Sequence, residues 1–288
     1  MNKKYILLVQ ALILLTLAFG CTMKEAEESN TFEVNEENEY LVSEFAKIPI
    51  AQVEYIDLTD SNFNDVESIL LDIDYYVRSI TRYIDRTEWK DNYTERHGEE
   101  FEFKIKIGLT QGASQVKGGY KQFVYLPLEI KFNEGLIESN KAPIAHEVTH
   151  LIAPYYSSLS LREGLACVIQ DEIGKNPSVF NFGQPVDELS RQYLVKENTV
   201  DYNDVIDSIG ESDIPEHLNL SKMDIETRKA YYILSHSFSK YLIDKYGLEK
   251  FMLAYEAEEL NEKYIELYDK NLDELRQDWI LYVLENES

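Results

Sequence analysis

The segment from residue 144 to residue 170 reads IAHEVTHLIAPYYSSLSLREGLACVIQ. Its first part contains His146-Glu147-Val148-Thr149-His150, which is an H-E-x-x-H pattern. Residues four apart lie on one face of a helix, so the two imidazoles would lie one turn apart and could hold one metal ion. The glutamate between them is placed to act as a base. The pattern predicts a metal-binding helix near the middle of the chain.

A catalytic zinc site uses three protein ligands and leaves one position open. His146 and His150 supply two of them, and we expect Glu163 to be the third. Pro154 ends the first helix and lets the chain turn back, so that a second helix from about Ser160 can bring this carboxylate to the histidines. The alternative is that the H-E-x-x-H pattern is incidental and lies on an ordinary amphipathic helix.

The metzincin arrangement is excluded by two positions. It requires a third histidine six residues after the second and a glycine between them. Tyr156 and Ala153 occupy these positions instead.

The composition restricts the classes of partner. The chain has 288 residues, of which 44% are hydrophobic, so it can bury a core as one large domain or as two lobes. Its formal net charge is -25. A surface this acidic repels nucleic acid and anionic lipid headgroups, so we expect neither as an electrostatic partner.

The N-terminus has the features of an export signal. Lys3 and Lys4 precede an apolar run that ends Leu17-Ala18-Phe19-Gly20-Cys21. This ending resembles a bacterial lipobox, which implies a lipoprotein signal peptide at 1–20 and a lipid anchor on Cys21. The protein would then lie on the extracytoplasmic face of the bacterial cell membrane. The alternative is an ordinary cleaved signal peptide with an incidental cysteine.

Residues 21–40 are rich in Glu and Asn and predict an acidic flexible tether. Cys167 lies in an apolar run and is expected to be a small buried side chain. Lipidation of Cys21 would leave no pair of cysteines for an intramolecular disulfide.

Hydrophobic periodicity predicts an α+β fold. A long helix should run from Asn62 or Asn64 to about Arg86, and alternation at 101–109 predicts a strand. A second strand is expected at 120–132, with Pro127 favouring an edge position or a break. Such a strand could bind an extended peptide or be an ordinary sheet edge. Further helices are expected at 187–197, 224–245, 248–259 and 271–285.

Two lobes follow from this pattern. Residues 41–173 are expected to form an α+β lobe with a small mixed or antiparallel sheet and the zinc helix. Residues 174–288 are expected to form a mostly helical C-terminal lobe.

The H-E-x-x-H pattern followed by R-E-G-L-A at residues 162–166 resembles the gluzincin metallopeptidases, and in particular their compact bacterial members. Weaker similarity continues at residues 230–238 and 272–275. The resemblance implies a zincin-like fold, a Zn²⁺ ion and a peptide or protein substrate. Gly164 lacks a side chain and is expected to allow close helix packing near the metal.

The resemblance also implies roles for individual residues. Glu147 would take a proton from water and pass it to the leaving amine. An oxyanion donor is expected from Tyr231, Tyr232 or His236 on a later helix, and the sequence does not choose among them. Tyr232 and His236 are one turn apart and could both face the cleft.

Two questions stay open at this point. A carboxylate should orient the ligating histidines, and Asp171, Glu172 and Asp187 are all within reach. The function competing with a zinc peptidase is a non-catalytic lipoprotein that binds a peptide or an envelope component on the same scaffold.

Overall fold

The computed structural model describes residues 33–35, 40–53, 56, 65–91, 93–94, 104–111, 114–117, 128–139, 141–195, 202–220 and 222–285. The predicted signal peptide at 1–20 and the predicted lipidation site Cys21 lie outside these residues. Among the helices that the structure describes, none is both long enough and apolar enough to cross a membrane.

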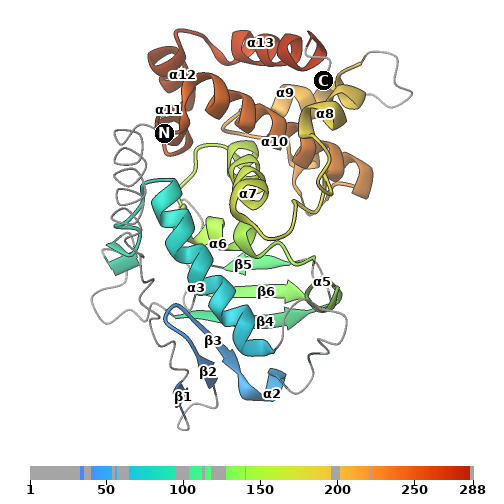
Figure 1. The fold of residues 1–288 in the computed structure, drawn as a ribbon. Coiled ribbons are helices and arrows are strands. Elements are labelled where there is room, and N and C mark those ends of the chain that lie inside the picture. Colours follow the sequence, from blue (N-terminus) through green and yellow to red (C-terminus); the bar gives the residue numbers. More distant parts are fainter. Residues whose placement is uncertain are drawn as a thin grey trace, which may run out of the picture. The chain divides into compact units, whose positions relative to one another are not determined.

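The structure is α+β and contains a six-stranded mixed sheet with strand order β1-β2-β3-β4-β6-β5 (Figure 1). The strands β3, β4 and β6 run parallel, while β1, β2 and β5 pair antiparallel with their neighbours. The strand bounds are Glu33–Asn35 (β1), Tyr40–Val42 (β2), Ala46–Pro49 (β3), Ile105–Thr110 (β4), Gln115–Lys117 (β5) and Glu129–Asn133 (β6). The prediction of a small mixed sheet is confirmed.

Of the two outcomes expected from Pro127 for the strand at 120–132, the edge position is wrong and the break stays a prediction. Its described part is β6, which pairs with β4 on one side and β5 on the other. The edge strand at this end of the described sheet is β5, which the sequence did not predict. Three residues are too few to show the alternation that marks a strand. Pro127 lies outside the described residues.

The predicted flexible tether at 21–40 also needs correction. Residues 33–35 form β1, and Tyr40 begins β2, with which β1 pairs. A polar composition does not prevent the backbone from pairing with a neighbouring strand, because the ladder uses main-chain groups. The other residues of the predicted tether lie outside the described part.

The first long helix, α3, spans Val66–Tyr83 and packs against β3 and α6. It begins after Asp65, whose carboxylate accepts a hydrogen bond from Ser68 N at 2.9 Å. A short acidic side chain at this position satisfies one of the free N–H groups of the first turn. The predicted apolar stripe is buried, and the helix ends three residues before Arg86.

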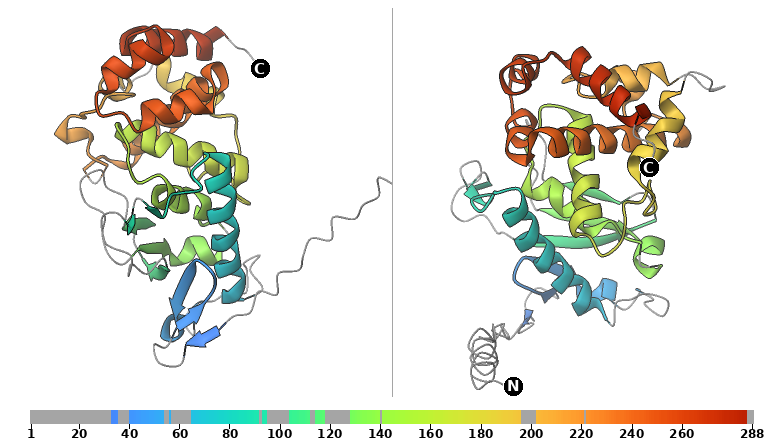
Figure 2. Two further views of the ribbon diagram at one scale, coloured as in Figure 1. Left: turned by 90° about the vertical axis from the view of Figure 1, so that its left-hand side faces the viewer. Right: turned by 45° about the horizontal axis from the view of Figure 1, so that its top comes forward.

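Two helices form the region that contains the H-E-x-x-H pattern and Glu163, as predicted. They are α6 (Ile144–Ile152) and α7 (Leu159–Ile173). Eleven consecutive residues of α7, Ser160–Gln170, are buried. A helix buried on all sides needs neighbours on all sides. α7 packs against α6, α3 and α10, and these helices lie together in all views (Figures 1 and 2).

The C-terminal part is helical, as predicted. Residues Phe32–Ser288 form one compact unit, in which α7 packs on α10 across the expected lobe boundary at residue 174. Helices α9 and α12 were not predicted. The remaining helices are α2 (Ile50–Val53), α5 (Glu134–Glu138), α8 (Val186–Leu194), α9 (Asn203–Ser208), the 3-10 helix η1 (Glu216–Leu218), α10 (Ile225–Tyr246), α11 (Leu248–Tyr255), α12 (Leu260–Tyr268) and α13 (Leu272–Glu285).

Gly164 is where α7 and α10 come closest. A Cβ atom at this position would overlap the hydroxyl of Ser239 and the carbonyl oxygen of Ser235. The close approach expected from the sequence is therefore present, and its partner is α10.

Replacing Gly164 with alanine should destabilise the protein by about 1–3 kcal/mol, because the added methyl group overpacks the contact between α7 and α10. Urea unfolding measures this loss. The control is Gly135→Ala in α5, where a Cβ atom would meet no atom closer than 3.4 Å. Equal stability of the Gly164→Ala variant and the wild type would show that the two helices can separate at no cost.

Candidate metal centre

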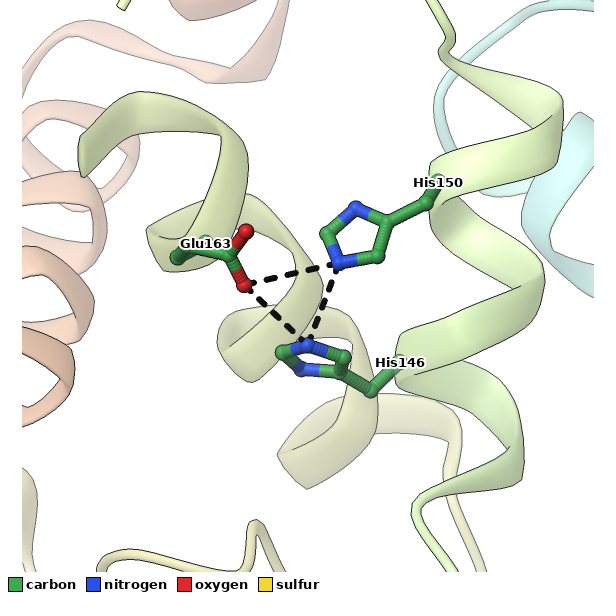
Figure 3. Close-up of side chains that lie close together, drawn as sticks. All are labelled: His146, His150 and Glu163. Carbon is green, nitrogen blue, oxygen red and sulfur yellow. Dashed lines mark hydrogen bonds and ion pairs between the residues drawn. The ribbon is translucent and has the colours of Figure 1, made fainter. Parts of the chain in front are cut away.

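Three side chains from α6 and α7 point toward one another (Figure 3). The Nε2 atoms of His146 and His150 lie 3.2 Å apart. Glu163 Oε2 lies 3.3 Å from the first Nε2 and 3.5 Å from the second. The three predicted ligands therefore converge on one point, and all three are buried.

These distances fit a metal ion. Zinc–nitrogen and zinc–oxygen bonds of roughly 2.0–2.2 Å in a tetrahedron separate the ligand atoms by about 3.3–3.6 Å. Two imidazoles and a carboxylate are also a ligand set that zinc accepts. His146, His150 and Glu163 would hold the ion and leave its fourth position to a reactant.

The turn between the two helices is held by buried tyrosines. Tyr93 donates a hydrogen bond to Leu151 O at 2.8 Å, and Tyr255 donates one to Ala153 O at 2.9 Å. Carbonyl groups at the end of a helix have no partner inside the helix, so these phenols satisfy the end of α6. The turn is further tied to α11 by Ser157 N, which donates to Tyr255 O at 2.6 Å. This packing fixes the direction in which α7 returns to the histidines.

Arg162 pairs with the other oxygen of Glu163. Its Nη1 lies 2.5 Å from Oε1, and it also lies over the ring of Tyr156 at 5.4 Å from the ring centroid. Burial by itself would raise the pKa of Glu163, but Arg162 and the two histidines hold it well below its usual value. The carboxylate is therefore charged, as a metal ligand must be. The sequence showed Arg162 next to Glu163, but it did not show on which side the guanidinium lies.

The carboxylates expected behind the histidines are elsewhere. Asp171 accepts from Ser178 N, and Asp187 accepts from the Ser237 hydroxyl. Glu172, the third candidate, is an exposed residue. Within the described part of the chain, none of the three carboxylates forms a hydrogen bond or an ion pair with His146 or His150.

Other groups lie behind the histidines. Cys167 Sγ lies 3.8 Å from His146 Nδ1, and Gln170 Oε1 accepts a hydrogen bond from His146 N at 2.9 Å. Cys167 is buried and free, as expected. It is four residues after Glu163 and so shares its face of α7, which is the only signal in the sequence for this contact. His150 Nδ1 is buried without a hydrogen-bond partner among the described residues.

His146 and Glu147 line a cavity of about 420 Å³. The pKa of Glu147 is raised to about 7, and burial of the carboxyl group is the largest cause. The cavity wall also includes the edge strand β5, the loop before α8 and the start of α10. Its other lining residues are Ser114, Gln115, Leu136, Pro143, Ser178, Val179, Phe180, Leu220, Arg228 and Tyr232.

The structure separates the three candidates for the oxyanion donor. Tyr232 lines the cavity and stacks on Phe180, with ring centroids 4.2 Å apart, while its ring lies 6.3 Å from that of His146. Burial holds the pKa of Tyr232 well above its usual value, so the phenol stays protonated and can donate. Tyr231 is fully buried and does not line this cavity.

His236 is not brought to the same cavity. It lines a different one, of about 390 Å³, where its Nε2 lies 3.8 Å from Asp171 Oδ2. One helical turn displaces a residue by about 5.4 Å along the axis, so sharing a face of α10 with Tyr232 does not place both side chains at one cavity. Burial lowers the pKa of His236 to about 4, and its ring is neutral.

No known protein family, curated protein or solved structure matches this chain. The geometry of the three ligands and of the cavity beside them therefore carries the functional argument.

A zinc ion held by these three residues should be bound about 10- to 100-fold more weakly when Arg162 is replaced with glutamine, because Glu163 loses the cation that pairs with its Oε1. Competition with a chromophoric chelator measures the dissociation constant. Arg86→Gln is the control, since it removes an ion pair with Glu256 away from the histidines. Unchanged zinc affinity in a folded Arg162→Gln variant would mean that Arg162 does not support the site.

Proposed function

We propose that this protein is a zinc-dependent peptidase with Glu147 as the general base. The observation that carries the proposal is the convergence of three ligand atoms beside a cavity that Glu147 also lines. A structural zinc site is closed by four protein ligands, whereas three ligands next to a cavity suit catalysis. The similarity to gluzincins, which implies a zincin-like fold, favours peptide bonds over other substrates of activated water.

Zinc, when bound, supplies a Lewis-acidic positive charge that acidifies water and polarises a carbonyl group. Glu147 takes a proton from the attacking water while the oxygen of that water bonds to the carbonyl carbon. The carbon–nitrogen bond then breaks, and Glu147 returns the proton to the leaving amine. Tyr232 donates a hydrogen bond to the carbonyl oxygen as negative charge develops on it.

The edge strand β5 supports a peptide as the substrate. Gln115 lies in β5 and lines the cavity, and one side of β5 is not paired within the described sheet. An extended peptide can pair with such an edge through its main chain. The strand addition expected for residues 120–132 is thus proposed for β5 instead.

Replacing Glu147 with glutamine should lower hydrolysis by at least about 100-fold, because the amide cannot accept the proton of water. The rate is measured by mass spectrometry on a mixture of peptides of natural sequence, with and without a chelator. The bound zinc should stay at the wild-type level, since Glu147 is not a ligand. Full activity in this variant would exclude Glu147 as the base.

Replacing Tyr232 with phenylalanine should lower kcat by about 10- to 1,000-fold with a smaller effect on KM, because the lost hydrogen bond forms mainly in the transition state. His236→Gln is the matched control from the next turn of α10, and it should leave kcat within a few-fold of wild type. The opposite pattern would assign the oxyanion donor to His236.

The alternative function, a lipoprotein that binds a peptide or envelope component without turnover, is separated by the same measurements. A protein that retains zinc and binds peptides without cleaving them would be such a binder. A folded protein that binds no zinc would also contradict the peptidase.

We also propose that the enzyme is anchored by a lipid on Cys21 at the extracytoplasmic face of the bacterial cell membrane. The support is the sequence pattern at residues 17–21 and the charged residues before the apolar run. The net charge of -25 continues to exclude nucleic acid as a partner of this surface.

A further inference from the structure

Arg228 is a basic residue in the wall of the cavity that the metal centre opens into. It lies in α10, one turn before Tyr232. Its Nη2 donates a hydrogen bond to Met223 O at 3.1 Å, which holds the side chain in place. Its Nε is buried and has no hydrogen-bond partner within the described part of the chain.

Among the described residues, no carboxylate forms an ion pair with Arg228. Of the described residues that line the cavity, only Glu147 is acidic. A guanidinium N–H that is taken out of water without a partner is costly. A ligand that accepts this hydrogen bond removes the cost, and the planar fork of arginine matches a carboxylate.

The positive charge of Arg228 contrasts with the acidic character of the whole chain. A net charge of -25 opposes the approach of anionic ligands. A local cation in the cavity can overcome this repulsion for one carboxylate. The same wall contains five apolar side chains, which suit an apolar residue next to that carboxylate: Leu136, Pro143, Val179, Phe180 and Leu220.

We infer that Arg228 binds a carboxylate of the peptide in the cavity. The inference rests on the proposed function, because it takes the cavity to be the peptide site. The carboxylate has two possible sources, the C-terminus of the peptide or an Asp or Glu side chain. A C-terminal carboxylate would make the enzyme trim peptide ends, whereas an acidic side chain would set the position of internal cleavage.

The test measures binding in the Glu147→Gln background, where bound peptides are not cleaved. The zinc-loaded protein is equilibrated with four mixtures of acetylated hexapeptides, and retained peptides are quantified by mass spectrometry. One mixture has a free C-terminus, and the other three are amidated and contain no acid, one Glu or one Gln. If the C-terminus is the ligand, the mixture with a free C-terminus should bind about 10- to 100-fold more tightly than the amidated mixture without an acid. If an acidic side chain is the ligand, the Glu mixture should bind more tightly than the Gln mixture by the same factor.

Three variants show whether Arg228 is the cause. Arg228→Gln should abolish the preference, and Arg228→Lys should keep part of it, because the charge remains and the fork is lost. Lys229→Gln is the matched control, since it removes a positive charge from the next position of α10, which does not line the cavity. It should keep the full preference.

The outcomes separate this inference from the proposed function. Peptide cleavage by the wild type without a carboxylate preference, or a preference that survives in Arg228→Gln, overturns the inference and leaves the peptidase. A preference that depends on Arg228 without any cleavage by the wild type upholds the inference and overturns the peptidase. Absence of both cleavage and binding overturns both.

Discussion

The rest of the site depends on the contacts of the buried Glu163 carboxylate with Arg162 and the two histidines. A charge that is 2% exposed costs several kcal/mol unless it is paired. One oxygen is paired with Arg162, and the other faces the two histidines of α6. The carboxylate thus ties α7 to α6 and remains ionised. The same group that requires these partners could therefore provide the third ligand of a metal ion. A metal ion at this point would be held by the Glu163 oxygen and the two Nε2 atoms.

The next constraint is the position of α7 between its neighbours. Glu163 and Gly164 are consecutive, and they face different neighbouring helices. The carboxylate meets α6, while the glycine lets α10 approach until its serines are in contact. Because α10 is held this close, its first turns reach the cavity, where Tyr232 and Arg228 stand in the wall with Glu147. The spacing of the helices therefore decides which residues of α10 line the cavity.

Sequence patterns with a local physical cause were reliable. The long apolar stripe of α3 and the two helices around the H-E-x-x-H pattern are present, because helix periodicity needs only neighbouring residues. Features that depend on distant partners were missed or misplaced. The edge strand β5 is three residues long, and β6 lies inside the sheet because it pairs with both β4 and β5. The contact of Cys167 with His146 likewise required the two helices to be packed.

The sequence by itself determined that the two histidines lie on one face of a helix with Glu147 next to the first of them, since a spacing of four residues in a helix places both imidazoles on one face whatever surrounds them. It also indicated Glu163, because a turn after α6 brings the next helix back. Only the tertiary structure decided which side chain of α10 reaches the cavity: Tyr232 lies there, and His236 lies beside Asp171. The reason is that residues one turn apart share a face but are displaced along the axis, and the packing of α10 on α7 sets which of them meets the cavity.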